Sequence, residues 1–346
     1  MSLGFRHPSI IGTVLVVAMA MPFGAVALLE PALLETKAEL PALEVSTVAL
    51  DRSGVLLRPF PIVDGRWRLE TRIEDVDPDY VAMLLAYEDK RFYRHHGIDL
   101  AALVRSVVMS VRHGRVVSGG STLTMQVARL IDGGKTRSVA SKLRQILLAM
   151  ALERRHDKAA ILTHYLNRAP FGGNLEGVRS ASLAYFGKEP LRLSAAEAAL
   201  LVALPQSPEA RRPDKGQSQR MVVTAARNRV LRRAFATGLI DDRQYGRALA
   251  EVVPEGRRPM PVLAAHLTER LAAEKPDRIV HNLTLDAALQ QRLEELARQE
   301  AERLGGGVSV AILVADHRSG AIRASVGSAD YFDRDRHGFV DMTRAV

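Results

Sequence analysis

The chain has 346 residues, enough for about two domains, and its 47% hydrophobic and 25% charged content is typical of folded protein. It contains no cysteine, which excludes disulfides, thiolate metal sites and a cysteine nucleophile. A net charge of +9 favours an anionic partner: a nucleic acid, a membrane surface or a phosphorylated substrate.

The N-terminal segment separates these three partners. No charged residue occurs from Pro8 to Leu29, and about 20 apolar residues suffice to cross a bilayer. Because Arg6 precedes this run and acidic residues follow it, we expect a transmembrane anchor over residues 1–30 and an exported body, which argues against a nucleic-acid partner. Pro22 and the small residues after it leave a cleaved signal peptide as the alternative.

Beyond the anchor, the sequence predicts a small hairpin, a long helical region and a second domain. Apolar runs on either side of Asp51-Arg52-Ser53-Gly54 predict a hairpin over residues 45–60, and Trp67 indicates a further strand. Helical patterns then extend from Asp77 to about Leu249, and prolines at 254–261 mark a boundary. We therefore expect a mainly α domain over 45–250 and a small α+β piece over 251–346, with two strands joined at 317–320.

Glu88 occupies an unusual place on the first of these helices. Asp77 can cap the helix with Pro78 at its first position. The buried stripe is expected at Val81, Leu84 and Leu85. Glu88 continues this stripe, and desolvation of a carboxylate on an apolar face raises its pKa toward the range of a general base or acid. The alternative is that Glu88 belongs to a solvated helix end.

A glycine-rich turn precedes a later helix. Ser118-Gly119-Gly120-Ser121-Thr122 leads into TLTMQVARL, and the free amides at a helix N-terminus bind phosphate oxygens well. Basic residues that could face a diphosphate follow at Lys135, Arg137, Lys142 and Arg144. The alternative for these residues is a solvated helix face near a membrane.

Five motifs in series give the chain a specific resemblance. EDKRFYRHHG, GGSTLTMQ, SKLRQILLAMALE, KAAILTHYLNRAPFGGNLEG with ASLAYFGK, and LSAAEAALLVALPQSP occur in that order. The series resembles that of the bacterial peptidoglycan glycosyltransferases, the N-terminal domains of class A penicillin-binding proteins, over about Val45 to Pro213. The variants GGSTLTMQ, KLRQ and NRAPFGG most resemble the penicillin-binding protein 1C branch of that family.

This resemblance implies a fold, a reaction and a location. The fold would be a lysozyme-like, mainly α glycosyltransferase domain on a single-pass anchor in the bacterial inner membrane, with the body in the periplasm. The reaction would join lipid II units to a growing glycan strand with inversion at the anomeric centre and release of undecaprenyl diphosphate. Glu88 would be the general base that deprotonates the acceptor 4-hydroxyl. Other cell-wall synthesis proteins are expected as partners, and a nucleic acid is not.

The resemblance also assigns the remaining site residues motif by motif. From the first and second motifs it implies substrate-binding roles for Asp89, Phe92, His95, Gly97, Gly120, Ser121, Thr122, Thr124 and Gln126. From the third and fourth motifs it implies such roles for Lys142, Arg144, Gln145, Tyr165 and Asn167, with Gly172 in the same stretch as the last two. For the fourth motif, helix packing and a turn are the alternative.

Gln145 departs from the family pattern, in which many relatives carry a second glutamate. A glutamine side chain cannot give or take a proton, so a mechanism with two carboxylates is in doubt. Cationic side chains or a divalent cation such as Mg2+ could instead stabilise a departing diphosphate. Glu153 lies about 12 Å further along the same helix, and we expect it to be a surface ion-pair partner.

The C-terminal piece resembles the opening strands of a penicillin-binding transpeptidase domain. That family has a Ser-x-x-Lys motif shortly after a segment like VDMTRAV, and no Ser-x-x-Lys occurs in this sequence. We therefore expect a truncated product without peptide cross-linking chemistry. Two other functions stay open: a lysozyme-like glycan hydrolase with Glu88 as acid, and a non-catalytic anchored scaffold.

Overall fold

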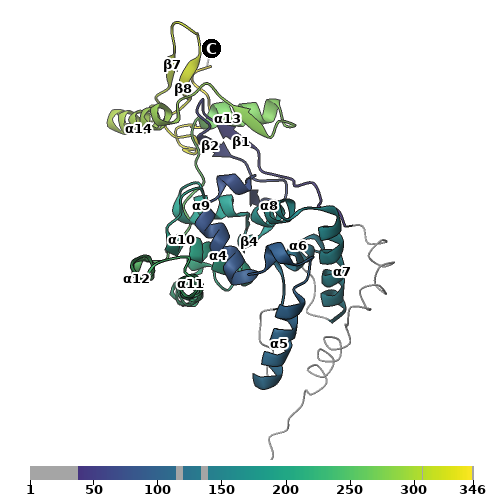
Figure 1. Cartoon of the computed structure of the whole chain (residues 1–346). Coiled ribbons are helices and arrows are strands. Elements are labelled where there is room, and N and C mark those ends of the chain that lie inside the picture. Colours follow the sequence, from purple (N-terminus) through teal and green to yellow (C-terminus); the bar gives the residue numbers. More distant parts are fainter. Residues whose placement is uncertain (1–37, 114–119, 134–138, 306, 345–346) are drawn as a thin grey trace, which may run out of the picture.

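A computed structural model describes residues 38–113, 120–133, 139–305 and 307–344 of the chain, with a helical body at its centre and the first and last strands of the chain at one end (Figure 1). The anchor predicted for residues 1–30 lies outside these ranges. Within them, none of the helices combines the length and the apolar character needed to cross a bilayer.

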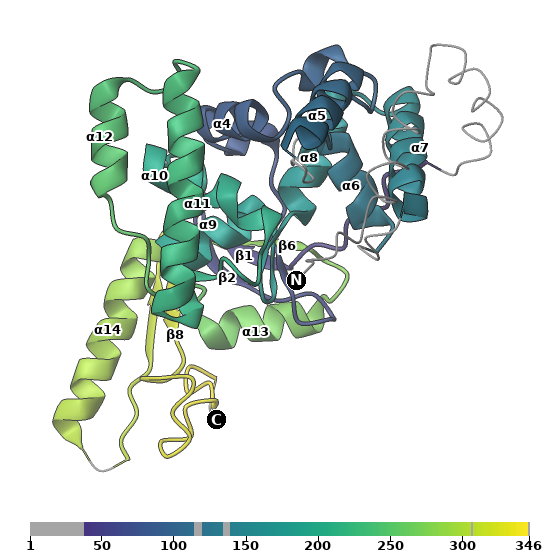
Figure 2. The same cartoon turned by 90° about the horizontal axis from the view of Figure 1, so that it is seen from below.

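The helical body follows the predicted region closely. Its helices are α4 (Pro78–Glu88), α5 (Leu100–His113), α6 (Leu123–Ile131), α7 (Val139–Arg155), α8 (Lys158–Arg168), α9 (Val178–Phe186), α10 (Ala195–Ala203), α11 (Gln217–Ala236) and α12 (Asp242–Ala250). Figure 2 shows α12 at one end of the body and α5 and α7 at the other, with α4 and α10 between them. Every residue from Ala198 to Ala203 is buried, and α10 packs against α4, α9, α11 and α12.

Helix α4 begins as its sequence predicts. The Asp77 carboxylate accepts a hydrogen bond of 2.9 Å from the backbone amide of Asp79, and Pro78 occupies the first helical position. The buried residues of α4 are Tyr80, Met83 and Leu84, whereas Val81 and Leu85 are only partly buried. The predicted stripe is therefore displaced around the helix, because α10 and α11 both cover α4.

The strands confirm the predicted hairpins and add one long-range pairing. β1 (Val48–Leu50) and β2 (Leu56–Pro59) form the predicted antiparallel hairpin, and β7 (Ile312–Ala315) and β8 (Ile322–Val326) form the other. β6 (Val280–Asn282) extends the first hairpin by pairing parallel to β1. The N-terminal hairpin thus lies against the C-terminal segment, which also contributes α13 (Ala265–Glu274) and α14 (Ala287–Leu304).

A second small sheet interrupts the helical region. β3 (Trp67–Arg68) is the strand predicted at Trp67, and it pairs with β5 (Leu175–Glu176), which in turn pairs with β4 (Pro170–Gly172). The sequence analysis assigned no strands to this part of the fourth motif. Gly172 has a φ of +102°, and a Cβ there would lie 2.9 Å from the carbonyl oxygen of Pro208, so this turn requires glycine.

Candidate active site

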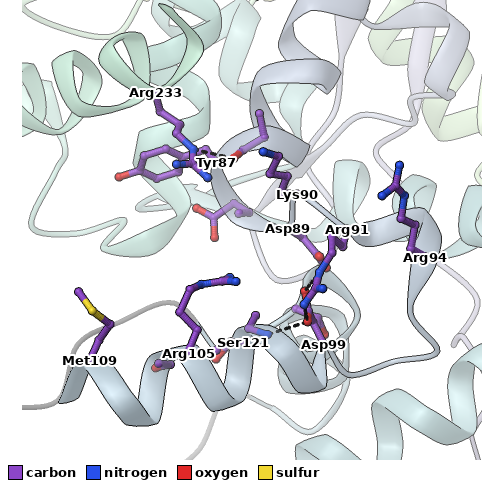
Figure 3. Close-up of a pocket in the computed structure, with 16 residues that line it drawn as sticks. Tyr87, Asp89, Lys90, Arg91, Arg94, Asp99, Arg105, Met109, Ser121 and Arg233 are labelled. Carbon is purple, nitrogen blue, oxygen red and sulfur yellow. Dashed lines mark hydrogen bonds and ion pairs between the residues drawn. The ribbon is translucent and has the colours of Figure 1, made fainter. Parts of the chain in front are cut away.

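Glu88 is the last residue of α4 and lines a cavity of about 800 Å³. Figure 3 shows this cavity. The cavity is lined by Ala86, Tyr87, Glu88, Asp89, Lys90, Arg91, Arg94, Asp99, Ala102, Arg105, Ser106, Met109, Gly120, Ser121, Thr122 and Arg233. The first two motifs therefore meet at one site, as the sequence analysis expected of Glu88, Asp89 and the glycine-rich turn.

Two glutamine side chains hold the Glu88 carboxylate. Gln126 donates its Nε2 to Glu88 Oε2 at 2.8 Å, and Gln206 donates its Nε2 to Glu88 Oε1 at 2.5 Å. Burial raises the pKa of Glu88, while these two hydrogen bonds and the charges of Arg211 and Arg129 oppose the rise without cancelling it. A carboxylate with a raised pKa is a stronger base than an ordinary glutamate, which suits it to remove a proton from a hydroxyl group.

Asp89 fixes the geometry next to this base. Its two carboxylate oxygens each lie 3.0 Å from His95 Nε2, and Oδ2 accepts a 2.8 Å hydrogen bond from the backbone amide of Leu123 at the start of α6. Asp89 and His95 are both buried. The two residues thus join the loop after α4 to the N-terminus of α6, and Asp89 also lines the cavity. Contact of Asp89 and His95 with substrate stays a prediction.

The end of the first motif is bound to both α6 and α7. The Thr122 hydroxyl donates to the Gly97 carbonyl oxygen at 2.6 Å and accepts from the Met125 amide at 3.1 Å, so Thr122 caps α6. Gly97 has a φ of +87°, and a Cβ on it would lie 2.7 Å from the carbonyl oxygen of Ala149 in α7. Only glycine fits this position.

Glu153 lies in a buried network, which corrects the expectation that it forms a surface ion pair. Its side chain is 3% exposed and its Oε1 accepts hydrogen bonds from Thr124 Oγ1 at 2.5 Å and from Lys158 Nζ at 2.7 Å. His95 Nδ1 lies 3.9 Å from the same oxygen. Glu153 is thus an ion-pair partner, but it stabilises the packing of α6, α7 and α8 from within.

The third motif contributes a lysine to the glycine-rich turn. Lys142 Nζ donates to Ser121 Oγ at 2.6 Å, which brings the ammonium group to the wall of the cavity. Burial lowers the pKa of Lys142, and the charge of Arg129 adds to this effect. An anionic group bound beside Ser121 would offset the charge of Lys142, so this position favours a negatively charged ligand.

Two other residues predicted for the third motif lie elsewhere. Arg144 is exposed, 3.7 Å from Asp132 Oδ1, and does not line the cavity. Gln145 is buried on α7. Lys135 and Arg137 lie outside the described residues. Of the four basic residues that the sequence offered for a diphosphate, the described part of the chain therefore brings only Lys142 to the glycine-rich turn.

Several cations that the sequence analysis did not assign line the cavity: Lys90, Arg91, Arg94, Arg105 and Arg233. Figure 3 shows Arg105 of α5 and Arg233 of α11 entering the cavity from opposite walls. Arg91 is paired with Asp99. Burial raises the pKa of Asp99, but the hydrogen bonds from Arg91 and from the amide of Ala102 lower it by more, so the pKa lies below its usual value. The resulting surface around Glu88 is strongly basic and suits an anion with several charges.

Phe92 and the residues of the fourth motif lie in the core rather than at the cavity. Phe92 and Tyr165 are almost fully buried. The Asn167 side chain donates to the carbonyl oxygens of Thr71 and Thr163, both at 2.8 Å, and accepts from the Thr71 amide at 2.9 Å. These contacts support the packing alternative for the fourth motif, and its contact with substrate stays a prediction.

The described ranges contain no protein-built site for the divalent cation that the sequence analysis allowed. Among residues 38–113, 120–133, 139–305 and 307–344, no three His, Asp or Glu side chains are grouped so that they could hold a metal ion. Of the cavity carboxylates, Asp89 is engaged with His95 and Asp99 with Arg91. The described residues of the cavity thus do not fit a resident metal.

Comparisons with known proteins agree with the motif series. A family model described as Transglycosylase matches residues 54–235, more than half of the chain. The chain is 43% identical over 300 residues to penicillin-binding protein 1C of Escherichia coli (strain K12), which covers 86% of this chain and 38% of that protein. It is 37% identical over 182 residues to penicillin-binding protein 1A of Aquifex aeolicus (strain VF5), covering 53% of this chain and 25% of that protein.

A solved structure, that of penicillin-binding protein 1A from Haemophilus influenzae, is 18% identical and covers 75% of this chain and 30% of that chain, with a TM-score of 0.35. The chain thus spans less than two fifths of the length of these relatives.

Proposed function

The chain belongs to the transglycosylase family, and we propose that it is a peptidoglycan glycosyltransferase of the penicillin-binding protein 1C type, which polymerises lipid II into β-1,4 glycan strands. The observation that carries this proposal is the position of Glu88. It is a partly buried carboxylate held by two amide groups at the edge of a basic cavity.

Glu88 acts as the general base in this proposal. Its ionised carboxylate accepts the proton of the acceptor sugar's 4-hydroxyl while that oxygen attacks the anomeric carbon of the donor. The new glycosidic bond forms as the bond between the anomeric carbon and the diphosphate oxygen breaks, so the anomeric centre inverts. The electron pair of the broken bond leaves with undecaprenyl diphosphate.

Departure of the diphosphate is assisted by positive charge. Lys142 is hydrogen-bonded to the Ser121 hydroxyl, and Arg105 of α5 also lines the cavity (Figure 3). Charge that develops on the leaving oxygen is stabilised by such preorganised cations, so the neutral Gln145 need not supply a proton. A divalent cation such as Mg2+ would have to be held by the diphosphate oxygens themselves, and no step is assigned to it.

The same proposal assigns the chain a place in the cell. The uncharged run from Pro8 to Leu29 would anchor it in the bacterial inner membrane, with the lysozyme-like catalytic body in the periplasm. Its partners there would be lipid II, the growing glycan strand, the membrane and other cell-wall synthesis proteins. The basic cavity favours a diphosphate donor over the uncharged glycan that a hydrolase would cleave.

Polymerisation of labelled lipid II by the natural chain and by Glu88→Gln tests this function. We expect the natural chain to form polymer and the variant to be slower by a factor of roughly 10² to 10⁴, because glutamine cannot accept the proton. Glu255→Gln, at a side chain that is 79% exposed, is the matched control and should keep its rate. If Glu88→Gln polymerised lipid II at the wild-type rate, Glu88 would not be the general base. Release of cleaved glycan without polymer would favour a hydrolase.

A further inference from the structure

The hydrogen bonds of Glu88 extend to a residue outside the cavity. Gln206, at the end of the short 3-10 helix Leu204–Gln206, donates its Nε2 to Glu88 Oε1 at 2.5 Å. The carbonyl oxygen of the same side chain accepts a hydrogen bond of 2.8 Å from Arg211 Nη1. Arg211 and Glu88 therefore lie at the two ends of one amide group.

Arg211 decides which way this amide points. A guanidinium can only donate hydrogen bonds, and an ionised carboxylate can only accept them. The single orientation of Gln206 that satisfies both has its oxygen on Arg211 and its NH2 group on Glu88. Gln206 is exposed, so without Arg211 its side chain would be free to turn and to present its oxygen instead.

Arg211 is itself held firmly enough to do this. Its NH1 also donates to the carbonyl oxygen of Ala203 at 2.5 Å, and its backbone amide donates to the Ser207 carbonyl oxygen at 2.9 Å. Both acceptors lie within three residues of Gln206. The arginine and the glutamine thus form one compact turn after α10.

We infer that Gln206, oriented by Arg211, is a positioning residue that keeps the Glu88 carboxylate ionised and pointed at the acceptor hydroxyl. This inference rests on the proposed function for Glu88 as the base. Gln126 supplies the second amide donor from α6, so each carboxylate oxygen accepts one N–H group. Protonation of Glu88 on Oε1 would set an O–H group against the NH2 group of Gln206 and break this match.

Other groups also act on Glu88. Burial raises the pKa of Glu88, and the hydrogen bonds of Gln206 and Gln126 and the charges of Arg211 and Arg129 lower it. Tyr80 of α4 and Tyr165 of α8 are buried neutral phenols, since burial and the charge of Glu88 raise the pKa of both. Because Arg211 acts both through Gln206 and directly through its charge, the two routes must be separated by experiment.

A comparison of single and double variants separates the effect of Arg211 through Gln206 from its direct charge effect on Glu88. The acid limb of kcat/KM for lipid II polymerisation is measured against pH for the natural chain, Gln206→Met, Arg211→Met and the double variant. We expect each single variant to move the midpoint of this limb up by about one pH unit, because a donor to the ionised form is lost. The double variant should move it no further than the larger single shift. Arg243→Met, which removes a charge from the exposed side of α12, should leave it in place.

The same variants give a readout that does not need turnover. The ¹³C chemical shift of the Glu88 carboxyl carbon, assigned by its absence from Glu88→Gln, follows protonation directly in the full chain. An upward shift of its titration in both single variants supports the relay even if the natural chain forms no polymer, in which case the proposed function alone fails. Additive shifts in the double variant, or no shift in Gln206→Met, would overturn the relay and leave the proposed function standing.

Discussion

The substitution Asp89→Asn tests whether the two first motifs are joined as the structure indicates. Asparagine keeps the shape of the side chain but removes its charge and replaces one oxygen by a donor group. Asp89 now accepts from both His95 and the amide of Leu123, the first residue of α6, and it lies 6% exposed. The change therefore weakens two buried hydrogen bonds at once.

The expected loss follows from these contacts. A hydrogen bond to a charged group contributes about 1.5–3 kcal/mol and a neutral one about 1 kcal/mol, so two weakened bonds cost roughly 2 kcal/mol. Loss of a negative charge at a helix N-terminus adds about 0.3–1 kcal/mol. We expect the free energy of unfolding of the helical body to fall by about 2–3 kcal/mol. The polymerisation rate should fall as well, because α6 carries Gln126, which holds Glu88.

Urea unfolding followed by circular dichroism measures this loss. The midpoint should decrease while the slope stays constant, since the extent of the surface exposed on unfolding does not change. Asp79→Asn is the matched control, because Asp79 is an exposed carboxylate in the first turn of α4. A loss below about 0.5 kcal/mol in Asp89→Asn would show that the buried carboxylate does not join the motifs, because one intact hydrogen bond alone contributes more.

Three further outcomes are expected. Lys142→Ala should reduce lipid II polymerisation more than Gln145→Glu changes it, since cations rather than a second acid assist the diphosphate; an inactive natural chain rescued by Gln145→Glu would contradict this. The expressed chain should keep its N-terminus and fractionate with inner membranes in high salt, whereas a mature protein beginning at Leu28 would indicate signal cleavage. Burial and nearby positive charge lower the pKa of His164 from 6.5 to about 4. Between pH 4 and pH 6.5 the unfolded state therefore binds more protons than the folded state. The free energy of unfolding should then fall by up to about 3 kcal/mol as the pH drops from 6.5 to 4, and His164→Gln should lack this fall.

The sequence predicted those features whose causes lie close together in the chain. The cap of α4 depends on Asp77 and its immediate neighbours, and the turn at residues 51–54 selects the hairpin of β1 and β2, so both were confirmed. The pairing of β6 with β1 joins segments more than 200 residues apart and carries no local signal. The stripe on α4 was displaced because the sequence of one helix does not reveal that two others cover it.

The same distinction holds for the site. The sequence singled out Glu88 as a candidate from its place on a helix, but it could not single out Gln206, which is bound to Glu88 and lies 118 positions away in the chain. Gln206 stands within the quoted motif LSAAEAALLVALPQSP, so the segment was marked although the residue was not. Arg105 and Arg233 reach the cavity from helices that carry no chemical signature of their own. Which of many arginines face a cavity is decided by packing.

The environments of Asp99 and Glu88 shift the pKa values of these two cavity carboxyl groups in opposite directions, which favours a single base. Asp99 is paired with Arg91 and caps α5, which holds its pKa below the usual value despite burial, so it stays ionised. Glu88 is held only by neutral amides, and burial leaves its pKa raised. When two carboxyl groups of one site are shifted in opposite directions, the one with the raised pKa is the group that exchanges protons. Gln145 is buried and cannot donate a proton, so the proposed mechanism assigns proton removal to Glu88 and assistance of the departing diphosphate to positive charge.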